Sequence, residues 1–159
     1  MLLAWTLAMT LASSSFIANG LLPAWTAHGD ARCPGLNRSP ELHWTTPPAG
    51  TRSLALVTYD PDARGGWYHW VIYDLTPATN HLPVAVTLEP QRLGITSFNE
   101  HGYGGPCPPP GPPHHYVFTL YALDIASVGA SHPLDGPSLL ERIRGHVLAT
   151  ARLVGLYGR

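Results

Sequence analysis

Lysine is absent from this sequence, and all nine of its side-chain cations are arginines. Without lysine, the chain cannot form a Schiff base through a side-chain amine and cannot carry a phosphate-loop lysine. Charge of either sign is also scarce, because charged residues make up 12% of the chain and the formal net charge is -1. No basic run is present, so we expect no nucleic-acid partner.

Long apolar runs are missing as well. None reaches the roughly 18 residues that a membrane-spanning helix needs, which predicts no transmembrane segment. The chain instead combines 45% hydrophobic residues with 16 glycines and 17 prolines. Disordered chains are poor in apolar residues, and 159 residues is the length of one domain. We therefore expect residues 1–159 to form a single domain with many turns.

Cysteine is rare, with only two residues, Cys33 and Cys107. Each lies next to a proline, so we place both in loops, and their spacing fits no zinc-ligand pattern. One disulfide is expected if the compartment is oxidising, and two free thiols if it is not. The sequence leaves both alternatives open.

The first twelve residues fit two interpretations. Trp5, Leu7, Met9 and Leu11 alternate with smaller or polar residues, which is typical of a β-strand. The stretch also resembles the apolar core of a secretory leader, but a leader needs a positive N-terminal region and the first cation is Arg32. The strand interpretation goes with a cytoplasmic protein, whereas a truncated leader would predict a periplasmic or secreted one.

Three short segments have the composition of buried β-strands. They are nearly continuously apolar and end at Asp or Pro turns, which predicts central positions in a sheet with both faces buried. They span Ser53–Tyr59, Trp67–Leu75 and Tyr116–Leu123. Leu42–Trp44 and Val84–Leu88 are predicted edge strands. The fold class is therefore mainly β.

One helix is predicted near the C-terminus. Residues 135–138 supply an N-cap and an early proline, and Ser138 with Glu141 fits a capping box. Apolar residues then recur at helical spacing from Leu140 to Val154. Gly145 interrupts this stripe, so a second interpretation ends the helix early and makes residues 153–157 a last strand.

Titratable side chains gather where the predicted strands begin or end. Asp60-Pro61-Asp62 follows the first strand, His69 lies at the start of the second, and His114-His115-Tyr116 leads into the third. If the strands are neighbours, these side chains meet in one concavity, as in small-ligand sites. Alternation along a strand puts His114 and Tyr116 on one face and His115 on the other. Taken singly, the Asp-Pro-Asp segment also fits an ordinary turn, and His69 a core residue bonded to the backbone.

Such a site suits an anion, because imidazolium and tyrosine hydroxyl groups donate hydrogen bonds while an aspartate orients the imidazole. The spacing is not diagnostic of a metal, and we predict neither metal nor cofactor. Nucleophilic catalysis is poorly supported, because no Gly-x-Ser-x-Gly motif is present and prolines flank Cys107. The stretch 102–113 has no strand or helix signal and is half proline, so we interpret it as a rigid wall beside the site.

The motifs around these residues resemble those of the phosphatidylethanolamine-binding protein family, most closely its bacterial Raf kinase inhibitor-like branch. They are, in chain order, Asp60-Pro61-Asp62-Ala63, Trp67-Tyr68-His69-Trp70, residues 102–109 and residues 114–118. Residues 37–42 with Trp44, residues 48–51 and the ending 155–159 also match that branch. The resemblance runs from about Phe16 to the end of the chain.

The resemblance implies a central β-sheet flanked by a smaller sheet, with a helix near the C-terminus, and a pocket for a small anion or a phospholipid headgroup. Carried over by motif, the pocket residues are Asp60, His69, His114 and Tyr116, with Asp62 in support and Gly105, Pro108 and Pro109 at the rim. Two residues depart from the family pattern. Arg64 replaces a proline and adds a cation near the site, and His115 replaces a common arginine.

We therefore predict a non-catalytic binding protein that modulates a kinase or protease partner. Two alternatives stay open. One is a small hydrolase that uses His69 or His114 as a base with Asp60 orienting it. The other is a protease inhibitor that acts through its surface.

Overall fold

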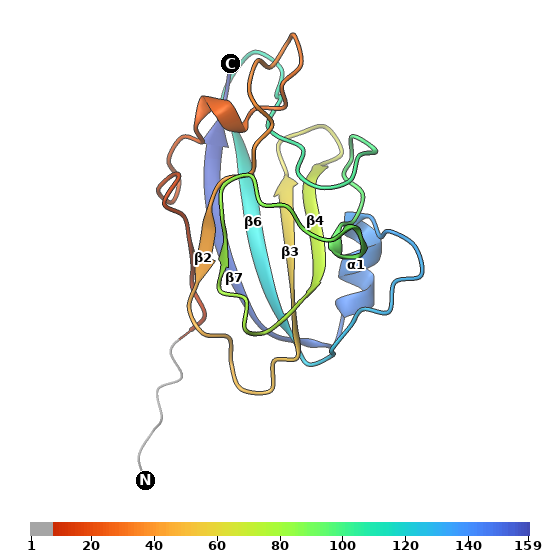
Figure 1. Cartoon of the computed structure of the whole chain (residues 1–159). Helices are drawn as coiled ribbons and strands as arrows, with labels where there is room; N and C mark the ends of the chain where they lie inside the picture. The colour runs from red at the N-terminus through yellow and green to blue at the C-terminus, as the bar shows by residue number, and fades with distance from the viewer. Residues whose placement is uncertain (1–7) are drawn as a thin grey trace.

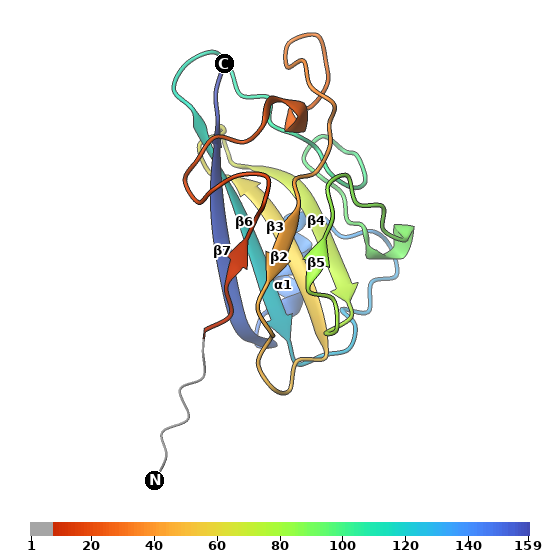
Figure 2. The same cartoon turned by 60° about the vertical axis from the view of Figure 1, so that its left-hand side comes forward.

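The chain forms two antiparallel sheets and one α-helix in a computed structural model that describes residues 8–159. The larger sheet has the order β4-β3-β6-β7 and the smaller one the order β1-β2-β5. The strands are β1 (Leu11–Ala12), β2 (Leu42–Trp44), β3 (Ser53–Asp60), β4 (Trp67–Leu75), β5 (His81–Leu82), β6 (His114–Leu123) and β7 (Val147–Tyr157), and the helix is α1 (Gly136–Ile143). Short 3-10 turns lie at Ala24–Thr26 and Pro90–Arg92. Figures 1 and 2 show the larger sheet between the smaller sheet and α1. The mainly β prediction with a flanking sheet and a C-terminal helix is confirmed.

The larger sheet is buried on both faces, which explains its nearly continuous apolar strands. In β3, Leu54 and Leu56 pack into the core beneath the smaller sheet, while Ala55 and Val57 pack into the core beneath α1. All four are buried. Because successive strand residues point to opposite faces, a strand between two cores needs apolar residues at both parities.

The prediction that all three long segments lie at the centre of the sheet is wrong for β4, which is an outer strand. Its faces are buried nonetheless, and the segment 93–104 covers its outer edge. The backbone N–H groups of Gly94, Ser97 and Gly104 donate to carbonyl oxygens of β4, each at 2.8 Å. This cover satisfies β4 carbonyls that a bare outer strand would leave open.

The C-terminal region follows the second interpretation, with a short helix and a last strand. Asp135 is the N-cap, and its Oδ1 accepts a hydrogen bond from the Ser138 N–H at 2.8 Å, so the Ser138–Glu141 capping box is not formed. The helix ends at Ile143, two residues before Gly145, whose φ of +82° favours glycine. The later part of the predicted stripe lies in β7, which pairs with β6 over its length.

The short strand predictions are only partly right. Leu42–Trp44 is a strand, but it is the middle strand of the smaller sheet. Val84–Leu88 forms no strand, and Ala85 within it has a φ of +55°, which interrupts extended backbone. Its place at the edge is taken by β5. Of the predicted N-terminal strand, only Leu11–Ala12 form a strand (β1); residues 8–10 belong to none, and residues 1–7 lie outside the described residues. Over residues 8–159 the structure contains no helix with the length and hydrophobicity to span a membrane.

Candidate functional site

A cavity of about 490 Å³ lies at the end of the larger sheet where β3 ends and β4 and β6 begin. Antiparallel pairing of β3 with both neighbours places these three strand ends side by side. The pocket is lined by Arg32, Asp60, Asp62, Ala63, Arg64, Trp67, His69, Phe98, Cys107, Pro108, Pro109, His114 and Tyr116. The structure thus brings together seven of the eight predicted site residues, and the eighth, Gly105, is not in the lining.

Asp60 and His114 form a close pair at the base of the pocket. The Asp60 Oδ2 lies 2.7 Å from His114 Nδ1, and Asp60 is 2% exposed. The other carboxylate oxygen accepts the backbone N–H groups of Asp62 at 2.8 Å and Ala63 at 3.1 Å. One carboxylate therefore both closes the turn after β3 and sets the tautomer of the imidazole, with the proton on Nδ1 and Nε2 left for the pocket. The turn and pocket interpretations of this motif are compatible.

His69 is almost fully buried in the wall that β4 contributes. Its Nδ1 lies 2.7 Å from the carbonyl oxygen of Gly104, and since a carbonyl only accepts, Nδ1 carries the proton. Burial lowers the pKa of His69 to about 4, against the opposing effects of the Gly104 hydrogen bond and the Asp60 charge. His69 is therefore a neutral imidazole near pH 7, with Nε2 as an acceptor.

Two buried donors at the pocket have no partner. The Tyr116 hydroxyl and the Trp67 indole N–H are both buried and make no hydrogen bond. Burial, together with the nearby Asp60 charge, raises the pKa of Tyr116, so its hydroxyl keeps its proton. An unsatisfied buried polar group costs about 1–3 kcal/mol. Groups left unpaired in this way at a cavity are expected to meet a ligand that accepts hydrogen bonds.

Asp62 lines the pocket, and its partner His115 lies outside the pocket. The Asp62 Oδ2 accepts the backbone N–H and lies near the Nδ1 of His115, both at 2.7 Å, and the backbone hydrogen bond from His115 lowers the Asp62 pKa. His115 is exposed and absent from the lining, in agreement with strand alternation. The pair fixes the turn after β3 against the start of β6.

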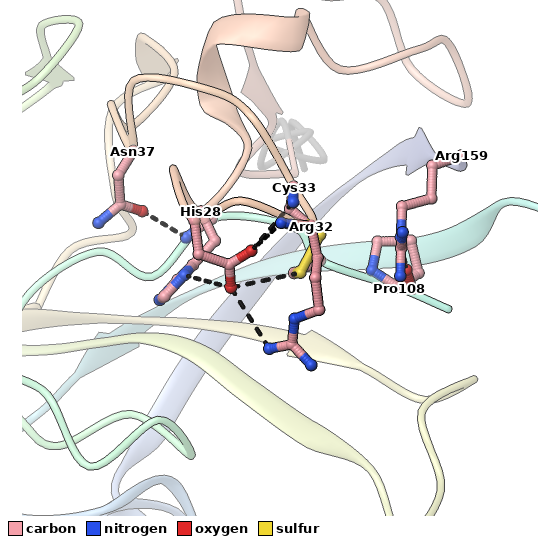
Figure 3. Close-up of a disulfide and its surroundings, with 9 residues drawn as sticks. His28, Arg32, Cys33, Asn37, Pro108 and Arg159 are labelled. Carbon is pink, nitrogen blue, oxygen red and sulfur yellow. Dashed lines mark hydrogen bonds and ion pairs between the residues drawn. A yellow bond between two sulfur atoms is a disulfide. The ribbon is translucent and has the colours of Figure 1, made fainter. Parts of the chain in front are cut away.

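The predicted wall divides into a packed part and an exposed part. Residues 104–106 are buried and residues 109–113 are exposed. Pro108 and Pro109 line the pocket, and the Pro108 carbonyl accepts a hydrogen bond from the Arg159 Nε at 2.6 Å. A disulfide joins Cys107 to Cys33 and so ties the wall to an N-terminal loop (Figure 3). Of the two cysteine alternatives, the structure therefore has the disulfide.

Gly105 lies behind this wall. Its N–H donates to Asn37 Oδ1 at 2.7 Å, and a Cβ added to it would overlap the carbonyl oxygen of Thr26. The requirement for glycine here comes from backbone packing between two loops, because no side chain fits between them.

Sequence reasoning missed Arg32 and Phe98, which come from separate loops. Arg32 precedes Cys33, so pairing the cysteines would have placed it at the wall. Phe98 contacts both His69 and Trp67 edge-on, at centroid distances of 5.5 and 5.3 Å, and no sequence pattern marked it. Arg64, the departure from the family motif, lines the pocket and is exposed, which supplies a second cation at the mouth.

Because His69 is neutral in the folded protein, the free energy of unfolding depends on pH. Its pKa is about 4 when folded and about 6.5 when unfolded, so protons bind the unfolded chain first as the pH falls. Neutral His69 makes its full contribution to the free energy of unfolding above pH 6.5. About 3 kcal/mol of that free energy is lost between pH 6.5 and pH 4. Urea unfolding at several pH values should show this loss in the wild type. We expect a smaller loss in His69→Asn, which keeps a donor for the Gly104 carbonyl; equal losses would contradict neutral burial.

The comparisons with known proteins agree with this architecture. A family model described as phosphatidylethanolamine-binding protein matches residues 12–158. A UPF0098 protein of Methanothermobacter thermautotrophicus is 39% identical over 161 residues, which covers 95% of this chain and 99% of the relative. A Mycobacterium tuberculosis protein whose name describes it as a lipoprotein, LppC, is 36% identical and covers 94% of this chain and 72% of its own length. The crystal structure of Escherichia coli YbcL, described as a member of the mammalian PEBP family, has a TM-score of 0.89 at 30% identity and covers 96% of this chain and 99% of YbcL.

Proposed function

Because this chain belongs to the phosphatidylethanolamine-binding protein family, we propose that it binds a phosphate-like anion or phospholipid headgroup without transforming it. The observation that carries this proposal is the pair of buried, unpartnered donors, Tyr116 Oη and Trp67 Nε1, at the cavity. Phosphate oxygens accept hydrogen bonds from neutral donors and attract cations. Arg32 and Arg64 supply the cations at the mouth.

The neutral His69 narrows the kind of anion that fits. With its proton on Nδ1, the ring offers only an acceptor at Nε2, which would repel the oxygen of a fully ionised phosphate. The monoanion of a phosphomonoester such as phosphoethanolamine has acceptor oxygens for Tyr116 and Trp67 and one P–OH that donates to His69. We therefore expect binding to strengthen as the pH falls towards the second phosphate pKa of about 6.

The hydrolase alternative has one observation in its favour, the Asp60–His114 pair at 2.7 Å, since a carboxylate that orients an imidazole makes up two of the three members of a catalytic triad. The described lining nevertheless contains no serine or threonine, and its one cysteine is in the disulfide. The described lining therefore offers no serine or threonine hydroxyl and no free thiol as a nucleophile. The pocket supports retention of a ligand better than covalent attack on it.

Tyr116→Phe tests the role of the unpartnered hydroxyl. A hydrogen bond to a charged group contributes about 1.5–3 kcal/mol, so we expect phosphoethanolamine and inorganic phosphate to bind about tenfold to 150-fold more weakly. Stability should stay equal or rise, because the variant removes a buried hydroxyl that has no partner in the free protein. Calorimetric titration measures the affinity, and ³¹P spectra of the same samples show whether the phosphoester stays intact.

Tyr121→Phe is the matched control, because Tyr121 lies on the same strand but on the opposite face. Its affinity for both phosphates should equal that of the wild type. Unchanged binding in Tyr116→Phe would argue against an anion at this hydroxyl, and release of inorganic phosphate by the wild type would support a hydrolase instead.

The proposal extends to a kinase or protease partner and to the compartment in which the protein works. A partner that contacts the pocket mouth should be displaced by saturating phosphate, whereas an inhibitor that acts through another surface should not. The Cys33–Cys107 disulfide favours the periplasmic or secreted alternative over the cytoplasmic one, because disulfides persist in oxidising compartments. The lipoprotein name of the Mycobacterium tuberculosis relative is in line with this preference.

A further inference from the structure

The disulfide lies within a cluster of metal-ligating side chains. The sulfur atoms of Cys33 and Cys107 and a carboxylate oxygen of Asp30 all lie within 4.8 Å of one another. Asp30 Oδ2 is 3.9 Å from the Cys107 sulfur. Asp30 is held in place through its other oxygen, Oδ1, which accepts the backbone N–H groups of Arg32 at 2.8 Å and Cys33 at 3.0 Å (Figure 3). The Oδ2 atom is therefore presented towards the sulfurs by the fold of the loop.

His28 lies next to this three-residue cluster, beside Asp30. Both of its ring nitrogens are buried and neither has a hydrogen-bond partner. The Nδ1 atom is 3.6 Å from Asp30 Oδ2, beyond hydrogen-bond distance, and the ring is stacked on Phe98 at a centroid distance of 4.2 Å. The Nε2 atom lies 3.6 Å from a carboxylate oxygen of Glu100, so the ring stands between two carboxylates and the Phe98 ring. These contacts fix its orientation, with Nδ1 on the side of Asp30.

We propose that reduction of the disulfide converts this cluster into a site for Zn²⁺ or a similar divalent ion, with Cys33, Cys107, Asp30 and His28 as ligands. Two thiolates, a carboxylate and an imidazole are ligand types that zinc takes in tetrahedral sites. Zn–S bonds of about 2.3 Å require the two sulfurs to lie roughly 3.8 Å apart. The loop backbone already suits this separation, since the two Cα atoms are 5.3 Å apart.

The reduction and the metal binding balance as two steps. A dithiol reductant gives two electrons and two protons to the Cys33–Cys107 bond, which becomes two thiols, and the dithiol is itself oxidised to a disulfide. Binding of the metal then displaces one proton from each thiol. Two thiolates and one carboxylate carry three negative charges, which a divalent cation and the nearby Arg32 guanidinium, 3.4 Å from Asp30 Oδ2, together neutralise.

The site gives the two loops alternative cross-links. In an oxidising compartment the disulfide joins the segment around Cys33 to the pocket wall, and in a reducing one the metal ion joins the same two segments. The sequence spacing shows no zinc motif because the ligands come from two loops that are far apart in the chain. Only the fold brings them together.

Cobalt titration of the reduced full-length chain tests the proposal. The protein is reduced anaerobically with a phosphine, which becomes a phosphine oxide and, unlike a dithiol, competes little for metal. We expect one Co²⁺ per chain, a thiolate-to-cobalt charge-transfer band, displacement by Zn²⁺ and release of two protons from the thiols. The oxidised protein should show none of these signals. Failure of the reduced wild type to bind, or equal binding by the oxidised protein, would overturn the proposal.

Variants assign the ligands and guard against adventitious binding. Asp30→Asn keeps the oxygen that accepts the loop N–H groups, and His28→Gln removes the imidazole; each should weaken Co²⁺ binding by at least about tenfold. His43→Gln is the control, because His43 lies beside Glu41 and His81 on the smaller sheet and should change nothing. If His43→Gln abolishes the signal and Asp30→Asn does not, the metal is at that second cluster and the proposal is wrong. If the reduced chain loses its near-ultraviolet circular dichroism, Zn²⁺ should restore it, and failure to do so would count against the site.

Discussion

Replacement of Cys33 and Cys107 together by serine is expected to lower the free energy of unfolding by about 4.5 kcal/mol. The disulfide joins residues 74 positions apart, and a cross-link that closes so long a loop removes much conformational freedom from the unfolded chain. The loss is a large fraction of the total free energy of unfolding of a domain, which is typically about 5–15 kcal/mol. Urea unfolding of the double variant and the oxidised wild type measures the difference.

Reduced wild-type protein is the control for this variant, because it lacks the cross-link but keeps both sulfur atoms. With a chelator present to keep metal away, its stability should match that of the double serine variant. A loss smaller than about 1 kcal/mol would show that the folded loops, rather than the cross-link, hold the wall in place. Phosphate affinity should also fall, because Arg32 and Cys107, on the two sides of the bond, both line the pocket.

The strands of the larger sheet could be predicted closely because buried strands consist almost entirely of apolar residues. Trp67–Leu75 is predicted and observed with the same bounds, and the strand predicted from Ser53 extends one residue further, to Asp60. These segments lie between two cores, so apolar residues occupy both faces and mark the strand from end to end. The outer position of β4 could not be predicted, because the segment that covers it buries it as fully as a neighbouring strand would.

The end of the helix was harder to predict than its beginning. Asp135 and Pro137 mark the start by local chemistry, whereas the apolar residues after Ile143 fit both a helix face and a half-buried strand. Residues 147–157 form a strand because they pair with β6. This pairing is a property of the tertiary structure, so the local sequence does not show it. The positive φ of Gly145 is the local feature that makes the change of direction possible.

The pocket could be predicted as far as neighbouring strands supply it. Asp60, His69 and His114 lie at the ends of three adjacent strands, so strand order alone brings them together. Arg32 and Phe98 come from loops without periodicity, and their places depend on the disulfide and on packing against His69. Gly105 carried a motif signal, but a glycine beside a ligand and a glycine between two backbones look alike in a sequence.

Gly105→Ala is expected to lower the free energy of unfolding by about 3 kcal/mol or more. The added Cβ would overlap the Thr26 carbonyl oxygen and approach the backbone nitrogen of His28 to 2.8 Å. Both are backbone atoms, so relief requires a shift of one loop against the other. That shift would break the bond from the Gly105 N–H to Asn37 Oδ1, which is 2.7 Å long. Thermal unfolding followed by circular dichroism, with calorimetric titration of phosphate, measures the effect.

Gly111→Ala is the control, because it lies in the same proline-rich stretch with no heavy atom within 4 Å of an added Cβ. Its φ of +143° makes alanine unfavourable there, so a loss of about 1 kcal/mol is expected. If Gly105→Ala instead keeps wild-type stability and loses only phosphate affinity, Gly105 is a rim residue, as the family resemblance implied. A large loss of stability assigns it to the packing of residues 26–28 against 104–106, and this packing then holds Cys107 and Pro108 at the pocket.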